Sequence, residues 1–177
     1  MFSSQRISLR KVDRTDAEKY HIWRNDMEVM SYTNLSLDQY TIEDTQHFVE
    51  SVLMDASSSK SYMIVDNEEN LSIGITSLIH IDGKNRNAEC IIDIGEKQYW
   101  GNGYGKEALS LLLDFAFNEL NLHRISLNVF SFNKRAIHVY QSLGFIQEGT
   151  SRQALFRNGQ WHDIIQMGIL QAEWSNN

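Results

Sequence analysis

Three glycines, Gly101, Gly103 and Gly105, alternate with single residues near the middle of the chain. The apolar residues Ile91, Ile92 and Ile94 precede them, and residues 108–120 after them carry apolar side chains at helical spacing. This order predicts a strand, a tight loop and a helix in direct succession. Glycine adopts positive φ and lets a ligand approach the backbone, and the first turn of a helix leaves N–H groups unpaired. The loop therefore predicts a site for a phosphate or pyrophosphate.

Two familiar phosphate-binding loops do not fit this spacing. The dinucleotide fingerprint requires Gly-x-Gly-x-x-Gly and an acidic residue about 20 positions later, whereas residues 121–129 hold no carboxylate. A Walker loop requires Ser or Thr after Gly-Lys, and here Gly105 and Lys106 are followed by Glu107. Taken alone, the loop is also compatible with a purely structural turn.

A second motif runs from Asn133 to Phe145 with the pattern Asn-x-x-Ala-x-x-x-Tyr-x-x-x-Gly-Phe. It predicts one short and complete helix. Asn133 is a typical N-cap, and Gly144 is typical of the left-handed residue that ends a helix. Apolar side chains share one face between these ends, and Phe145 is expected to fold back toward Tyr140.

The two motifs, in this order and spacing, resemble the GNAT superfamily of acetyl-CoA-dependent N-acetyltransferases. Over residues 71–170 the sequence is similar to the branch of RimJ/RimL-type ribosomal-protein acetyltransferases and spermidine N-acetyltransferases. Residues 87–89 and 156–160 belong to that resemblance, whereas the first 70 residues match less specifically. The resemblance implies one GNAT domain over residues 1–177.

Hydrophobic periodicity predicts the strands. They are expected near residues 6–12, 62–65, 71–81, 88–94 and 124–129, and the Asn158-Gly159 turn predicts a hairpin over residues 149–170. The strands at 88–94 and 124–129 are joined by a helical crossover and are therefore expected to be parallel.

Two helix starts are predicted before the first hairpin, at capping boxes formed by Thr15 with Glu18 and by Thr41 with Asp44. In agreement with the resemblance, the fold class is α/β (α+β). We expect a GNAT fold with a mixed, mostly antiparallel central sheet of six to seven strands and about four helices on both faces.

The composition predicts a soluble enzyme. The 177 residues are 42% hydrophobic and 22% charged, which is ordinary for a globular domain. The formal charge of −7 argues against nucleic-acid binding and mildly favours cationic substrates. No apolar run approaches a membrane span, and the chain start lacks the apolar region of a signal peptide. Cys90, the only cysteine, forms no internal disulfide, which favours a cytoplasmic location.

The resemblance implies how acetyl-CoA is held. Backbone groups of residues 92–94 are expected to bind the pantetheine arm, and the glycine loop the pyrophosphate. Lys106 is expected to add positive charge or to be a solvated surface residue, and Trp100 is interpreted as a packing anchor more than a ligand contact. The predicted cofactor-binding residues are Ile92, Asp93, Ile94, Gln98, Tyr99, Trp100, Gly101, Asn102, Gly103, Tyr104, Gly105, Lys106, Asn133 and Tyr140.

Two side chains are candidates for catalysis. The resemblance implies that Tyr140 protonates the departing thiolate of CoA, and a phenol is protonated at neutral pH. The alternative is a core tyrosine packed under Phe145. Glu89 stands where several members of the superfamily have the general base, and the alternative is a carboxylate in solvent. Cys90 is not expected to be a nucleophile, and the histidines show no metal-ligand spacing, so no metal is predicted.

The predicted activity is direct transfer of the acetyl group of acetyl-CoA to a primary amine, without an acyl-enzyme. The acceptor stays open among a protein N-terminal α-amine, a polyamine and other small amines. Residues 31–36 lack the acidic run that spermidine acetyltransferases of this branch carry, which places polyamine specificity in question. The alternative function is a non-catalytic acetyl-CoA-binding module. The expected partners are a small-molecule amine or a peptide N-terminus, with neither nucleic acid nor membrane, and a homodimer is compatible with the sequence.

Overall fold

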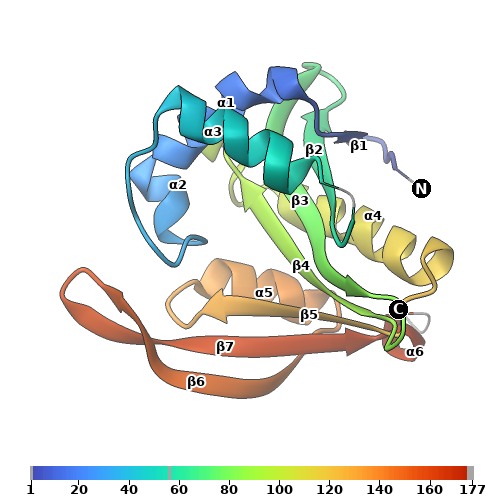
Figure 1. Cartoon of the computed structure of the whole chain (residues 1–177). Helices are drawn as coiled ribbons and strands as arrows, with labels where there is room; N and C mark the ends of the chain where they lie inside the picture. The colour runs from blue at the N-terminus through green and yellow to red at the C-terminus, as the bar shows by residue number, and fades with distance from the viewer. Residues whose placement is uncertain (1, 56, 175–177) are drawn as a thin grey trace.

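A seven-stranded sheet organises the chain in a computed structural model that describes residues 2–55 and 57–174 (Figure 1). The strand order is β1-β2-β3-β4-β5-β7-β6. Neighbouring strands are antiparallel except β4 and β5, which are parallel, as the helical crossover predicts. The strands are β1 (Ile7–Lys11), β2 (Lys60–Asp66), β3 (Leu71–Asp82), β4 (Asn87–Ile94), β5 (Arg124–Phe130), β6 (Ile146–Arg157) and β7 (Gln160–Leu170).

The described residues form six α-helices, two more than the sequence pattern predicts. The extra helices are short: α2 has five residues and α6 has four, too few for a periodic pattern to be visible in the sequence. None of the described helices is both long enough and apolar enough to span a membrane. The helices are α1 (Ala17–Asn25), α2 (Met27–Ser31), α3 (Ile42–Phe48), α4 (Tyr104–Asp114), α5 (Lys134–Ser142) and α6 (Gln171–Trp174).

Of the two predicted capping boxes, one begins a helix as predicted and the other does not. Thr41 and Asp44 cap α3 reciprocally, as predicted. Thr15 does not cap α1. Instead Asp13 and Asp16 form a capping box two residues earlier, which opens a 3₁₀ turn that leads into the helix. Asp16 is buried and paired with Arg10 of β1 at 2.7 Å, so a tertiary ion pair favours this register.

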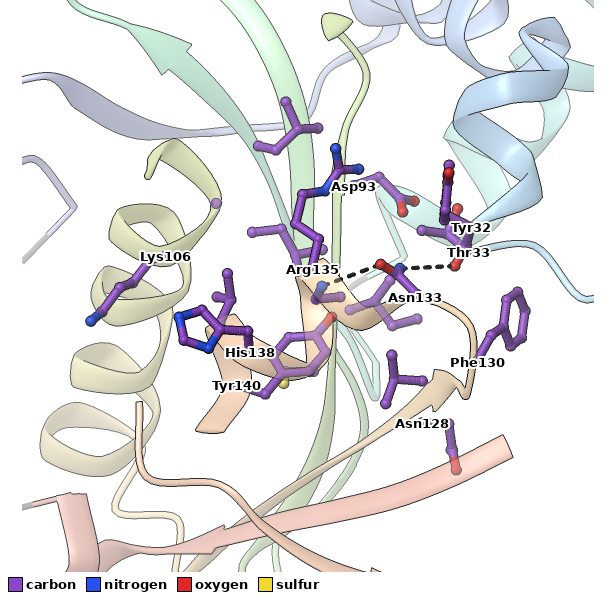
Figure 2. Close-up of a pocket in the computed structure, with 18 of the residues that line it drawn as sticks. Tyr32, Thr33, Asp93, Lys106, Asn128, Phe130, Asn133, Arg135, His138 and Tyr140 are labelled. Atoms are coloured by element: carbon purple, nitrogen blue, oxygen red, sulfur yellow. Dashed lines mark hydrogen bonds between the residues drawn. The ribbon is translucent and has the colours of Figure 1, made fainter. Parts of the chain in front are cut away.

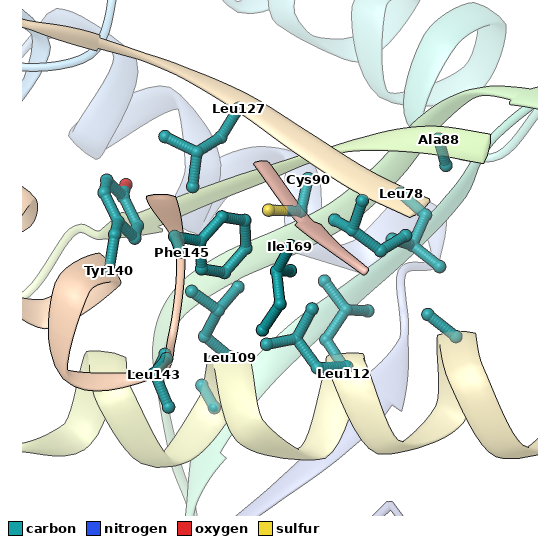
Figure 3. Close-up of a cluster of buried hydrophobic side chains, with 14 of the residues drawn as sticks. Leu78, Ala88, Cys90, Leu109, Leu112, Leu127, Tyr140, Leu143, Phe145 and Ile169 are labelled. Carbon is teal, nitrogen blue, oxygen red and sulfur yellow. The ribbon is translucent and has the colours of Figure 1, made fainter. Parts of the chain in front are cut away.

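The helices cover both faces of the sheet, as predicted. On one face, α1 and α3 bury a small cluster that contains Trp23, Val49 and Met63. On the other face, α4 and α5 cover the main core. Figure 3 shows Leu109 and Leu112 of α4 packed beneath Cys90 of β4 and Ile169. The layer of α4 and α5 is therefore fixed to β4, the strand that precedes the glycine loop, and the layer of α1 and α3 is fixed to β2 and β3.

The predicted turns have the expected backbone. Gly144 ends α5 with φ of 94°, and the ring of Phe145 lies 5.9 Å from that of Tyr140. Asn158 and Gly159 join β6 to β7 with φ of 51° and 76°, which fits a type I′ turn.

The contact between β4 and β5 is unusually short. Only Asn87, Ala88 and Glu89 pair with β5, opposite Arg124, Ile125 and Ser126. Beyond Glu89 the two strands separate although both continue, and Figure 1 shows them diverging. The sheet is therefore split along half of its central strand pair.

Candidate active site

A cavity of about 810 Å³ occupies the split between β4 and β5. Its walls come from four parts of the chain that are far apart in the sequence. They are α2 with the segment after it, β4 with the glycine loop, the end of β5 with α5, and strands β6 and β7. Three of these wall segments could be anticipated from the sequence, because the glycine loop and α5 carry the two motifs and β4 leads into the loop.

The glycine loop is built as an anion site requires. Gly101 and Gly103 have φ of 78° and 84°, a region that glycine adopts without strain. Gly103 is the N-cap of α4 and has no side chain to occupy the first-turn amides. Those amides and the positive end of the helix dipole are available to a phosphate.

Most of the predicted loop residues line the cavity, and two do not. Tyr99, Trp100, Gly101, Gly103, Tyr104, Gly105 and Lys106 are part of its wall. Gln98 and Asn102 are not part of that wall. The Asn102 side chain donates to the Gln98 carbonyl at 3.2 Å, so the pair closes the loop on itself. Any cofactor contact by these two residues stays a prediction.

Arg6 supports the glycine loop from the start of β1, a contact that the sequence did not reveal. Its guanidinium donates to the Asn102 carbonyl at 3.0 Å, lies 4.5 Å from the centre of the Tyr104 ring and forms an ion pair with Glu107. Because the partner residues are about a hundred positions away, no local pattern could indicate this brace.

Trp100 packs against neighbouring groups, which is the role that we favoured from the sequence. Its indole N–H donates to the Ile94 carbonyl at 2.7 Å, and its ring meets Tyr32 edge-on at 6.0 Å. The guanidinium of Arg135 lies 4.2 Å from the centre of the same ring. Arg135 also lines the cavity, although the sequence analysis did not select it. Its position inside the second motif was the signal that could have identified it.

Tyr140 lies in the cavity wall with its ring buried against the core. In Figure 2 its hydroxyl points from α5 into the cavity. Burial raises the pKa of the phenol well above its ordinary value, and the nearby Cys90 and Asp93 raise it further. The hydroxyl is thus a protonated group that can donate to a leaving thiolate. His138, two residues earlier, also lines the cavity and is exposed.

Asn133 caps α5, as predicted. Its side-chain oxygen accepts from the Ala136 amide at 3.2 Å, and its amide nitrogen donates to the Tyr32 carbonyl at 3.4 Å. Figure 2 shows both contacts. The residue is buried and joins the start of α5 to the end of α2, across the mouth of the split. Its contact with a cofactor stays a prediction.

Glu89 lies where β4 leaves β5 and is part of the cavity wall. Its side chain is 25% exposed, so water reaches it. One oxygen accepts from the Asn128 amide at 3.0 Å, and the other lies 3.5 Å from His80 Nδ1. The position suits a base that works through water, because the carboxylate borders both solvent and the cavity.

Asp93 is a second carboxylate on β4, and its side chain was overlooked in the sequence. Its Oδ1 is buried and has no hydrogen-bond partner among the described residues. Burial raises the pKa of this carboxyl to about 6, while the Thr33 side chain lowers it by hydrogen bonding. An acidic residue inside the apolar run 90–94 was the signal that could have marked it.

Other reactive groups have structural surroundings. Cys90 faces the core, and burial raises the pKa of its thiol, which disfavours a thiolate nucleophile. Within residues 2–55 and 57–174, no group of three His, Cys, Asp or Glu side chains is arranged to hold a metal ion.

The segment between α2 and α3 closes one side of the cavity. It contributes Tyr32, Thr33 and Leu35 to the wall. Arg157, at the tip of the β6–β7 hairpin, is buried and donates to the Asn34 carbonyl at 2.6 Å. The hairpin thereby fixes the segment over the split.

Comparison with known proteins agrees with this geometry. The sequence model of the acetyltransferase (GNAT) domain matches residues 6–146. Spermidine N(1)-acetyltransferase of Vibrio cholerae serotype O1 is 30% identical over 98% of both chains. The enzyme of the same name from Escherichia coli K12 is 32% identical over 98% of this chain and 91% of its own. The crystal structure of spermidine N-acetyltransferase from Vibrio cholerae in complex with CoA and spermine covers 98% of this chain and 100% of its own, with a TM-score of 0.89 and 29% identity.

Proposed function

The chain belongs to the GNAT family of acetyltransferases, and from this premise we propose that it acetylates a primary amine on a small cationic molecule. Family membership and the relatives make it an acetyl-CoA-dependent N-acetyltransferase. The observation that carries the proposal is the split between β4 and β5. It places the anion-binding glycine loop, the Tyr140 hydroxyl and two carboxylates around one cavity.

The residues present fit acetyl-CoA. Past Glu89, the side of β4 that faces β5 is unpaired, so backbone groups of residues 92–94 are available to the pantetheine amides. The uncapped start of α4 suits the pyrophosphate, and Lys106 and Arg135 bring positive charge to the same wall. Bound there, acetyl-CoA supplies a thioester whose carbonyl carbon is the electrophile.

The proposed transfer needs one base and one acid. A neutral amine attacks the thioester carbonyl carbon, the C–S bond breaks, and Tyr140 gives its proton to the leaving thiolate. Backbone N–H groups of β4 stabilise the oxyanion. After the C–N bond forms, the nitrogen loses its second proton to the phenolate of Tyr140, which restores the acid. Before the attack, Glu89 removes the first proton from the ammonium group through a water molecule. For a polyamine nitrogen with pKa near 10.4, that deprotonation costs about 4.6 kcal/mol at pH 7, against about 1 kcal/mol for an α-amine.

Polyamines are the first candidates for the acceptor. The two relatives compared above are named spermidine N(1)-acetyltransferases, and the related crystal structure contains spermine. Residues 31–36 carry no carboxylate, so in this chain the negative groups at the cavity are Glu89 and Asp93 on β4. A peptide N-terminus is the second candidate, since it needs less deprotonation. The comparisons give no support to a non-catalytic acetyl-CoA-binding module, and a cytoplasmic location stays a proposal.

A panel assay tests this function. Thiol release from acetyl-CoA is measured with spermidine, spermine, an N-terminal peptide, free amino acids and an aminoglycoside, with acetyl-CoA alone as the blank. We expect turnover with the polyamines well above the blank. Turnover with the peptide alone would replace the proposed acceptor class, and no turnover with any amine would contradict the proposed function.

A further inference from the structure

An unpaired carboxylate oxygen lies inside the protein at the wall of the cavity. Asp93 stands in the apolar part of β4, and its Oδ1 is shielded from solvent without a hydrogen-bond partner among the described residues. Burying such a group costs free energy unless a partner compensates it. Arg157 Nη1 is the other buried side-chain atom in this condition within the described residues, and it is not part of the cavity wall.

Glu89 and Asp93 differ although they share a face of β4. Their side chains alternate with those of Ala88 and Cys90, which enter the main core on the opposite face. Both Glu89 oxygens face a neighbouring side chain, Asn128 or His80, and water reaches the residue. Asp93 has one oxygen without a hydrogen-bond partner among the described residues. It lies four residues further along β4, within the segment that we propose holds the pantetheine arm.

Among residues 2–55 and 57–174, no positively charged side chain lowers the pKa of the Asp93 carboxyl. The phenols of Tyr20 on α1 and Tyr140 on α5 are close enough for the Asp93 charge to raise their pKa, and Tyr140 is buried while Tyr20 is partly buried. Figure 2 shows the Asp93 carboxyl directed toward Thr33, after α2. Arg135, a cation of the cavity wall, lies against the rings of Trp100 and Tyr32, at 4.2 and 5.6 Å from their centres. A cation brought by a ligand would complete the site.

We propose that Asp93 is the residue that receives the acceptor, with its free Oδ1 accepting a hydrogen bond from a protonated amine of the substrate other than the neutral amine that is acetylated. This inference rests on the proposed function and deepens it, because it names the side chain that selects charged amines over neutral ones. The Asp93 carboxylate is near enough to Tyr140 to raise the pKa of its phenol. It can therefore hold one ammonium group of the acceptor beside the reacting atoms. It binds small cationic amines as a class.

The test compares Asp93→Asn with the wild type on two acceptors. Spermidine is cationic at pH 7.5, and an arylamine is uncharged. Loss of a charge-assisted hydrogen bond should raise KM for spermidine about 10- to 100-fold, and should change KM for the arylamine little. Affinity for CoA, measured by calorimetry, should stay the same. Glu119→Gln, which removes an exposed carboxylate outside the cavity, is the matched control and should leave both KM values unchanged.

Three results would overturn the proposal. They are an unchanged KM for spermidine in Asp93→Asn, an equal rise in KM for both acceptors in that variant, and an equal rise in KM for spermidine in Glu119→Gln. If Asp93→Asn fails to bind CoA, Asp93→Ser repeats the comparison with a smaller side chain. If the wild type turns over no amine, the proposed function fails, and calorimetry of spermidine binding in the presence of CoA decides the role of Asp93. Weaker binding by the variant supports that role, and equal binding contradicts it.

Discussion

At the scale of single residues, the hydroxyl of Tyr140 is the group whose removal should affect chemistry alone. Tyr140→Phe keeps the ring against Phe145 and should keep the affinity for acetyl-CoA. Turnover should fall by roughly 10²–10⁴, as for a lost general acid. The measurement is kcat with a responsive amine. Tyr62→Phe, at another buried tyrosine outside the cavity wall, is the control. An undiminished kcat would make Tyr140 a core residue.

Glu89→Gln tests the proposed base through the shape of the pH profile. At low pH few acceptor molecules are neutral, so loss of the base should lower kcat/KM most there. At high pH the free amine predominates, and the variant and the wild type should converge. The parameters kcat and KM are measured separately from pH 6 to 10. Parallel profiles would exclude Glu89 from the proton transfer, and a raised KM with constant kcat would assign it to binding.

The ionised carboxylate of Asp93 should also lower the free energy of unfolding of the protein without ligand. Its pKa is raised from 3.8 to about 6 by burial, so the stability that this carboxyl contributes is complete below pH 3.8 and is lost as the pH rises through 6. Asp93→Asn should therefore raise the free energy of unfolding at pH 7.5 by roughly 1–3 kcal/mol, and by almost nothing near pH 4. Urea unfolding at both pH values measures the difference. A variant that is equally or less stable at pH 7.5 would show that the charge is not costly.

At the scale of elements, we expect the start of α4 to decide whether the pyrophosphate is bound. Gly103 has φ of 84°, and an added Cβ would lie 3.4 Å from the Arg6 guanidinium. Gly103→Val should abolish measurable acetyl-CoA binding in calorimetry, because the loop must change its backbone where phosphate approaches. Gly83→Val is the control, since an added Cβ there meets nothing within 4 Å. Retained affinity in Gly103→Val would contradict the anion site.

The individual helices also show how much of the fold could be predicted from the sequence. Local signals were sufficient where one element contains its whole pattern, as in α5, which Asn133 starts and Gly144 ends. They failed where two motifs overlap. Residues 13–18 contain both Asp-x-x-Asp and Thr-x-x-Glu, and Arg10, six residues before Asp16 on β1, stabilises the first. Likewise α3 and α4 each end in a π-helical turn, which apolar periodicity does not distinguish from an α-helix.

The candidate site was predictable in its main-chain parts and less so in its side chains. Family motifs locate the glycine loop and Tyr140 because both lie within continuous segments. The hydrogen bonds from Arg6 to the Asn102 carbonyl and from Arg157 to the Asn34 carbonyl join residues more than 90 positions apart. Only the folded chain brings these residues together. The free oxygen of Asp93 is also a product of burial, which the strand pattern alone does not give.

At the scale of the whole molecule, the charge of −7 and the two carboxylates on β4 act in the same direction. The overall field attracts cationic acceptors, and it weakens with added salt, whereas a buried carboxylate is screened little. A homodimer stays a prediction for this chain.

The split between β4 and β5 also makes a seam through the molecule. Three residue pairs join the four-stranded half to the three-stranded half by backbone pairing, although the main core spans both halves. Where β4 and β5 separate, their facing backbone groups should therefore exchange more readily when the cavity holds no ligand. CoA at 100 times its Kd should add about 2.7 kcal/mol of stability. If it bridges the seam, amide hydrogen exchange should slow in β5 and β7 as well as in β4. Protection confined to the glycine loop would contradict this. The substrate would then serve as a temporary part of the scaffold, and each product release would loosen the enzyme before the next cycle.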